Sequence, residues 1–183
     1  MSKKKIAVLF SGKGSNFAHI VNTLHLQELE VVIALTNKPD AGGIEVAKEA
    51  GIPLEIVDSS AFESRESFDT EVVGRLQKYQ PDLTVLAGFM RILTPVFTEQ
   101  IRAINLHPSL LPRHKGLRAI ERSFEDEHLT GGVSVHWVAS RLDGGEVILQ
   151  KEIDKSGLDF KQYEQKVRTV EKEVLVEAIR KVL

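Results

Sequence analysis

The stretch Ile6-Ala-Val-Leu-Phe10, followed by Ser11-Gly-Lys-Gly-Ser-Asn16, decides the fold class of this sequence. A run of consecutive apolar residues is typical of a strand that is buried on both faces. The Gly-rich segment then turns the chain into an amphipathic helix, which we expect to reach about Leu26. A buried strand that leads through a tight turn into a helix is the usual start of a βαβ unit.

The rest of the chain continues this alternation of strands and helices. Strands are predicted at 31–35, 54–57, 83–87, 103–106, 133–138 and 146–153, and helices at 42–50, 64–79, near 94–95, before 133 and from about 159. Such an order predicts an α/β fold, with a mostly parallel twisted sheet and helices on both faces. The last two strands are joined by a turn at Asp143 and can add an antiparallel edge in the C-terminal half. No linker or repeat divides the chain, so we predict one domain over residues 1–183.

The composition narrows the function. The 24 basic and 26 acidic residues give a formal net charge of −2, which does not suggest a nucleic-acid surface. There is no cysteine, which excludes disulfides and thiolate chemistry. No apolar run reaches the length of a membrane span, and no signal peptide is visible. We expect a cytoplasmic protein, a monomer or weak homodimer, that acts on small molecules without nucleic acid or membrane partners.

The segment Asn105-Leu-His-Pro-Ser-Leu-Leu-Pro112 carries the most informative polar residues. Side chains alternate along a strand, so Asn105 and His107 point to the same side. An amide can donate to an oxyanion, and an imidazole can move a proton near neutral pH. Asp143, from the Leu142-Asp-Gly-Gly145 turn, can orient the imidazole and raise its pKa. These are the groups needed to pass an acyl group to an amine.

Each of these features also has a purely structural interpretation. The loop Gly12–Asn16 is either a phosphate site at a helix N-terminus or an ordinary βα turn with a polar cap. His136 either faces the site or is a hydrogen-bonded strand residue. Arg65 and Arg91 can bind carboxylates or can be solvated cations. No spacing of His and acidic residues indicates a metal site.

Four motifs make the sequence resemble the phosphoribosylglycinamide formyltransferases, a branch of the folate-dependent formyltransferase family. They are Ser11–Asn16, Ala87-Gly-Phe-Met-Arg-Ile-Leu93, Asn105–Pro112 and Leu142–Gly145. The resemblance implies that the formyl group of 10-formyltetrahydrofolate, a co-substrate, passes to the amine of N1-(5-phosphoribosyl)glycinamide, as in de novo purine biosynthesis. No metal is implied. It also implies a nucleotide-binding half over about 1–100 and a catalytic, folate-binding half over about 101–183.

The resemblance also implies roles for single residues, in one cleft at the carboxyl ends of the strands. The catalytic residues would be Asn105, His107 and Asp143. The residues that hold the ribonucleotide would be Gly14, Ser15, Asn16 and Glu171. The residues that contact the folate would be Arg65, Met90, Arg91, Ile92, Leu93, Asn105, Ala139, Ser140, Arg141, Leu142 and Asp143, with Arg65 and Arg91 at its glutamate tail.

The sequence departs from the family pattern in three places. Arg113-His-Lys-Gly116 stands where relatives usually have Lys-Tyr-Pro-Gly, and Leu117–Arg122 replaces a stretch that carries a His. Gly131-Gly-Val133 replaces a His-Gly-Thr. We expect these segments to lie near the mouth of the cleft without touching the three catalytic residues.

Three other functions fit parts of the pattern. A related formyltransferase can act on a sugar nucleotide or on initiator tRNA, but the tRNA enzyme carries a further barrel domain and a basic face. A formyl-folate hydrolase would use water in place of the amine, and such enzymes carry an N-terminal regulatory domain. A noncatalytic nucleotide-binding module would not bring Asn105, His107 and Asp143 together.

Overall fold

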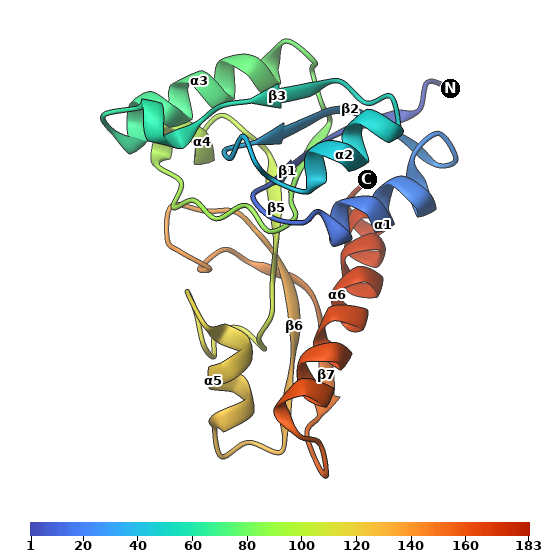
Figure 1. The fold of residues 1–183 in the computed structure, drawn as a ribbon, viewed down its shortest axis with the longest axis vertical. Coiled ribbons are helices and arrows are strands. Elements are labelled where there is room, and N and C mark those ends of the chain that lie inside the picture. Colours follow the sequence, from blue (N-terminus) through green and yellow to red (C-terminus); the bar gives the residue numbers. More distant parts are fainter. The chain divides into compact units, whose positions relative to one another are not determined.

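The computed structural model describes residues 1–183, and it contains one seven-stranded sheet with the strand order β3-β2-β1-β4-β5-β6-β7 (Figure 1). The strands are β1 Lys4–Phe10, β2 Leu29–Thr36, β3 Leu54–Ile56, β4 Leu83–Leu86, β5 Ala103–His107, β6 Thr130–Trp137 and β7 Val147–Asp154. The helices are α1 Ser15–Leu24, α2 Gly43–Glu49, α3 Arg65–Gln77, α4 Pro95–Thr98, α5 Ala119–Glu125 and α6 Phe160–Val182. A short 3₁₀ helix, Ser59–Ala61, was not predicted.

The chain divides into two compact units, Met1–Ile104 with Leu183, and Asn105–Val182. In the first unit β1 pairs in parallel with β2 and β4, and β2 pairs in parallel with β3. Residues Ile6–Phe10 are completely buried, as the apolar run predicts. Because β1 and β4 are parallel neighbours, the Gly-rich loop after β1 and the segment after β4 leave the same edge of the sheet.

Helix α3 begins next to residue 64, the predicted start of this helix, and Ser64 caps it. The Ser64 hydroxyl accepts from the Ser67 amide at 3.0 Å, and the Ser67 hydroxyl accepts from the Ser64 amide at 3.3 Å. This reciprocal pair satisfies two amides that the helix leaves unpaired, and such a cap typically stabilises by about 1 kcal/mol. It places Arg65 in the exposed first turn.

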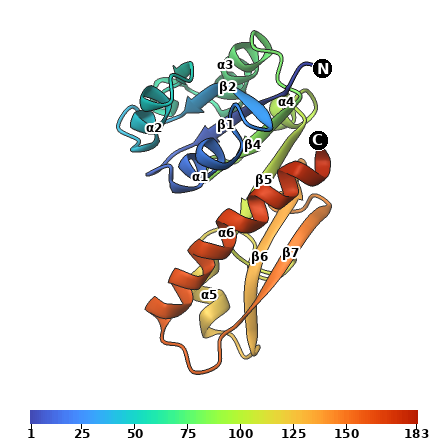
Figure 2. The ribbon, with the colours of Figure 1, turned by 90° about the vertical axis from the view of Figure 1, so that its right-hand side faces the viewer.

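In the second unit β6 and β7 form the predicted antiparallel pair, with a register shift between Val135 and His136. Helix α6 runs along this pair (Figure 2). Two glycines permit the packing, since a Cβ on Gly131 would lie 1.8 Å from the Tyr163 hydroxyl and one on Gly132 would lie 2.5 Å from Leu110. The departure from the family pattern at these residues therefore has a steric reason in this chain.

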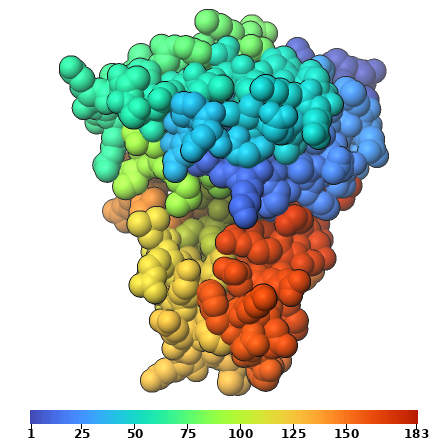
Figure 3. All heavy atoms as spheres, in the orientation of Figure 1, coloured from blue at the N-terminus to red at the C-terminus, as the bar shows by residue number.

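The lower end of the second unit is closed by aromatic side chains. The ring of Phe124 on α5 lies 5.6 Å from those of Phe160 and Tyr163 on α6, in edge and tilted arrangements. Figure 3 shows the segments around α5, in yellow, and the start of α6, in red, adjoining on one face. These contacts fix α5, which carries Arg122 and is followed by Asp126, two residues that are described below.

Candidate active site

The structure brings together the three residues that the sequence predicts as catalytic. Strand β5 presents Asn105 and His107 on the same side, and Asp143 reaches both from the turn after β6. The Asn105 amide nitrogen lies 3.5 Å from Asp143 Oδ1, and His107 Nδ1 lies 3.5 Å from Asp143 Oδ2. His107 and Asp143 are buried, with 6% and 8% of their surface exposed. A carboxylate, an imidazole and an amide thus meet in a site that is shielded from water.

His136 is a fourth member that the sequence left undecided. Its Nδ1 lies 2.9 Å from the Trp137 carbonyl, which can only accept, so Nδ1 carries a proton. In the neutral ring Nε2 is then an acceptor, and it lies 3.2 Å from the Asn105 amide nitrogen. His136 therefore fixes which way the Asn105 amide points. A register shift lies just before His136, and such irregularities in a strand often redirect a side chain near an active site.

The loop 113–118 touches both members of the buried pair. The His114 carbonyl lies 2.8 Å from His107 Nε2, and the Gly116 amide donates to Asp143 Oδ2 at 2.8 Å. The expectation that this departure from the family pattern stays clear of the three residues is wrong. The reason is the backbone, since His114 and Gly116 have φ angles of 54° and 80° that turn a carbonyl and an amide toward the pair.

Burial decides the charge of His107. It lowers the pKa of His107 and outweighs the opposing effects of the His114 carbonyl and the Asp143 charge. The direction of this shift favours the neutral ring near pH 7, and it is opposite to the rise in pKa that the Asp143 carboxylate alone predicts. Burial also opposes ionisation of Asp143, but its contact with His136 and the hydrogen bond from the Gly116 amide hold the pKa of Asp143 below its ordinary value. The neutral His107 can therefore act as a base, and the Asp143 carboxylate can stabilise the protonated His107 ring.

In the first unit, the Gly-rich loop ends at the N-terminus of α1. Gly14 has a φ of 81°, and a Cβ there would lie 2.6 Å from the Gly43 Cα, so both backbone angle and packing require glycine. Gly12 has open space where its Cβ would be. No side chain caps α1, and the amides of Ser15 and Asn16 belong to its first turn, where helices favour anions.

The segment after β4 is held in place from both ends. The Met90 amide donates to the Ser11 hydroxyl at 2.8 Å, and Thr94 donates twice to Asp69 at 2.7 Å. Arg91 stacks over the Phe68 ring, 4.7 Å from its centre. The apolar side chains between these anchors stay exposed, 61% for Met90 and 47% for Ile92, while Leu93 is half-buried. Exposed apolar side chains on a fixed backbone suit a flat aromatic ligand.

The remaining predicted residues differ in exposure. The loop Ala139–Leu142 is exposed and is closed by a bond from the Trp137 amide to the Glu146 carbonyl at 2.9 Å. Glu171 on α6 is buried, with 3% of its surface exposed, and its carboxylate lies 3.3 Å from Arg168. Glu171 is therefore a buried carboxylate and not part of an open surface.

Residues 4–179 match the formyl transferase family. The chain belongs to this family. It is 43% identical to the phosphoribosylglycinamide formyltransferase of Escherichia coli over 152 residues, 81% of this chain and 72% of that protein. It is 40% identical to the enzyme of the same name from Haemophilus influenzae over 154 residues, 82% and 73% of the two chains. These relatives place this formyl transferase in the phosphoribosylglycinamide branch, as the four motifs predict.

Solved structures of the same branch share the fold. The phosphoribosylglycinamide formyltransferase of Campylobacter jejuni superposes with a TM-score of 0.95 at 48% identity, covering 98% of this chain and 97% of that one. Glycinamide ribonucleotide transformylase 1 from Symbiobacterium toebii has a TM-score of 0.92 at 33% identity, with 97% and 86% covered. The predicted α/β fold with its antiparallel C-terminal strands is confirmed.

Two further observations describe this formyl transferase. Its side chains form no group of three or more His, Cys, Asp or Glu residues that could hold a metal ion. None of its helices combines the length and the apolar character that crossing a membrane requires.

Proposed function

We propose that the protein transfers the formyl group of 10-formyltetrahydrofolate to the amine of N1-(5-phosphoribosyl)glycinamide. The observation that carries the proposal is the meeting of Asn105, His107 and Asp143 in one buried site of a chain whose relatives bear this enzyme's name. No contact in the site favours a hydrolase that transfers the formyl group to water, or a formyltransferase that acts on a sugar nucleotide.

The geometry supports the following reaction. The substrate amine attacks the formyl carbon, a new C–N bond forms, and the carbonyl oxygen becomes an oxyanion. One N–H of the Asn105 amide stays on His136 Nε2, and the other, which faces Asp143 Oδ1 at 3.5 Å when no substrate is present, donates to that oxygen. The amine loses a proton to the neutral His107, and Asp143 stabilises the imidazolium. The bond to the folate nitrogen then breaks, and that nitrogen receives the proton.

The two substrates call for different surfaces. We assign the phosphate of the ribonucleotide to the amides of Gly14, Ser15 and Asn16, because a helix N-terminus without a side-chain cap favours an anion. Glu171 would serve the amine or ribose end. The pterin would lie on Met90–Leu93 and Ala139–Asp143. In this assignment residues 1–100 bind mainly the nucleotide and 101–183 carry the chemistry. Cytoplasmic location and a monomeric or weakly dimeric state stay predictions.

The direct test is an assay of formyl transfer with the purified protein. Tetrahydrofolate formation is followed by absorbance, and the formylated ribonucleotide is identified by mass spectrometry. We expect both products in equal amounts and only when both substrates are present. Formate release in the presence of the folate alone would mean that the enzyme is a hydrolase, and transfer to another amine but not to this one would refute the substrate.

Arg65→Ala is expected to raise the KM for the formyl-folate about two- to fivefold, because an exposed ion pair contributes about 0.2–1 kcal/mol. Arg65 is exposed in the first turn of α3 and is assigned to the glutamate tail of the folate. The KM for the ribonucleotide and kcat should change little, since this contact is equal in the ground and transition states. Steady-state kinetics with each substrate varied in turn measure both constants.

Lys78→Ala is the matched control for Arg65, because it removes an exposed cation just past the other end of α3. It should leave both KM values unchanged. A rise in KM confined to the ribonucleotide in Arg65→Ala would mean that the two ligands are assigned to the wrong surfaces.

A further inference from the structure

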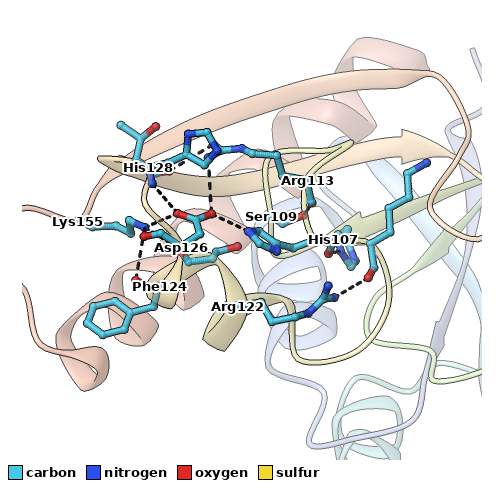
Figure 4. Close-up of polar contacts among 12 residues, drawn as sticks. His107, Ser109, Arg113, Arg122, Phe124, Asp126, His128 and Lys155 are labelled. Atoms are coloured by element: carbon cyan, nitrogen blue, oxygen red, sulfur yellow. Dashed lines mark hydrogen bonds and ion pairs between the residues drawn. The ribbon is translucent and has the colours of Figure 1, made fainter.

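A partly buried ion cluster centred on Asp126 lies next to the loop 113–118 (Figure 4). Asp126 follows α5, and its carboxylate lies 2.6 Å from His114 Nε2, 2.8 Å from Lys155 Nζ and 3.8 Å from Arg113. It also accepts from the His128 amide at 2.9 Å. The Lys155 side chain is only 9% exposed. These contacts hold the pKa of Asp126 far below its ordinary value despite its burial, so it stays charged.

The cluster is connected to the catalytic histidine through one residue. The side chain of His114 is bound by Asp126, and its backbone carbonyl lies 2.8 Å from His107 Nε2. The backbone of His114 is left-handed, with φ of 54°, a conformation that is unfavourable for a residue with a Cβ. A strained backbone of this kind persists only where its surroundings hold it. Here the ion cluster supplies the anchor.

The other end of the same loop is held separately. Arg122 on α5 donates to the Lys115 carbonyl at 2.5 Å and to the Leu117 carbonyl at 2.7 Å. Gly116, between these carbonyls, donates to Asp143. The amide that contacts Asp143 thus lies between carbonyls bound by Arg122, and the carbonyl that contacts His107 belongs to the residue bound by Asp126. The two can be perturbed one at a time.

We propose that Asp126 is a positioning residue for the reaction, acting through His114 to hold the carbonyl that keeps the proton of His107 on Nε2. The proposal rests on the function proposed above. A carbonyl can only accept, so its bond to Nε2 leaves Nδ1 as the lone pair of the neutral ring, facing Asp143. Without that carbonyl, the neutral ring would place its proton on Nδ1, toward the carboxylate, and could not take up a further proton there.

His114→Asn tests this role without disturbing Asp126. Asparagine tolerates the left-handed backbone, but its amide is too short to reach Asp126. The pair of Asp126 with Lys155 stays in place, so the variant should fold. His114→Gln is the conservative partner, because its amide can stand where His114 Nε2 stands and donate to Asp126. His128→Asn is the control, an exposed histidine beside the same cluster.

The first readout is the protonation of the His107 ring, measured by nitrogen-15 NMR of histidine-labelled protein and assigned with His107→Gln. We expect the proton on Nε2 in the wild type, His114→Gln and His128→Asn, and a shift toward Nδ1 with a lower pKa in His114→Asn. The groups that face His107, namely Asp143, His136 and Arg122, are the same in all variants. Identical His107 spectra in His114→Asn and the wild type would overturn the proposal, whatever the enzyme's substrate.

The second readout is kinetic. His114→Asn should lower kcat about 10- to 100-fold, as misplaced catalytic groups do, with little change in either KM. The acidic limb of its pH profile should move to lower pH, because the lost carbonyl bond favoured the charged ring. The His114→Gln variant should have the kcat and the acidic limb of the wild type. An equal loss in the Asn and Gln variants with an unmoved profile would overturn the proposal. A wild type that shows the expected ring protonation but no formyl transfer would instead refute the proposed function.

Discussion

Asp143→Asn is expected to lower kcat by about 10²- to 10⁴-fold, the usual contribution of a general acid–base group. The substitution removes the charge that stabilises a protonated His107 but keeps an oxygen that can accept from the Gly116 amide. The backbone of Asp143 is left-handed, with φ of 49°, a conformation that asparagine tolerates as well as aspartate. The fold and both KM values should therefore change little. Single-turnover and steady-state rates, with a melting curve, measure these effects.

Asp154→Asn is the control for Asp143. Asp154 is an exposed carboxylate at the end of β7 that accepts from the Ser156 amide at 2.8 Å. It should leave kcat unchanged. A turnover in Asp143→Asn within a few fold of the wild type would show that His107 works without the carboxylate.

Asn105→Ala should lower kcat by about 10²- to 10³-fold, the cost of removing one oxyanion donor. The structure gives the donor a defined direction, since the amide nitrogen faces His136 Nε2 at 3.2 Å and Asp143 Oδ1 at 3.5 Å. The donor gains most when the formyl oxygen becomes charged, so the loss should appear in kcat more than in KM. Steady-state kinetics with both substrates would show the division.

Asn105→Ala also leaves the buried Nε2 of His136 without its donor, so a melting curve must accompany the rates. Asn22→Ala, at an exposed position on α1, is the control for the substitution itself. A loss of the same size in KM for the folate, with kcat unchanged, would make Asn105 a binding residue only.

Much of this architecture could be predicted from local patterns. The apolar run Ile6–Phe10 predicts a strand buried on both faces because such a strand meets helices on each side. Ser64 predicts the start of α3 because a hydroxyl there satisfies a free amide. The alternation of side chains along β5 predicts that Asn105 and His107 point to the same side, where the structure has both contact Asp143. Each of these predictions depends on neighbours in sequence.

The parts that were missed depend on partners far apart in the chain. His136 becomes part of the site only because a register shift and a bond to the Trp137 carbonyl aim its ring at Asn105. The role of His114 rests on its backbone carbonyl, which no residue type specifies. Lys155 and Asp126 are 29 residues apart in the sequence, and the local sequence around neither residue predicts that they form an ion pair.

The anchoring of the loop 113–118 by Asp126 and Lys155 has a consequence for protein engineering. The loop is not an exchangeable module, because the residues that hold it lie after α5 and after β7. A graft of residues 113–118 alone from another enzyme would remove the partner that His114 provides to Asp126. The incoming loop would then lack the interactions that hold it in this structure. A working chimera in this scaffold would have to transplant the loop together with the positions equivalent to Asp126 and Lys155.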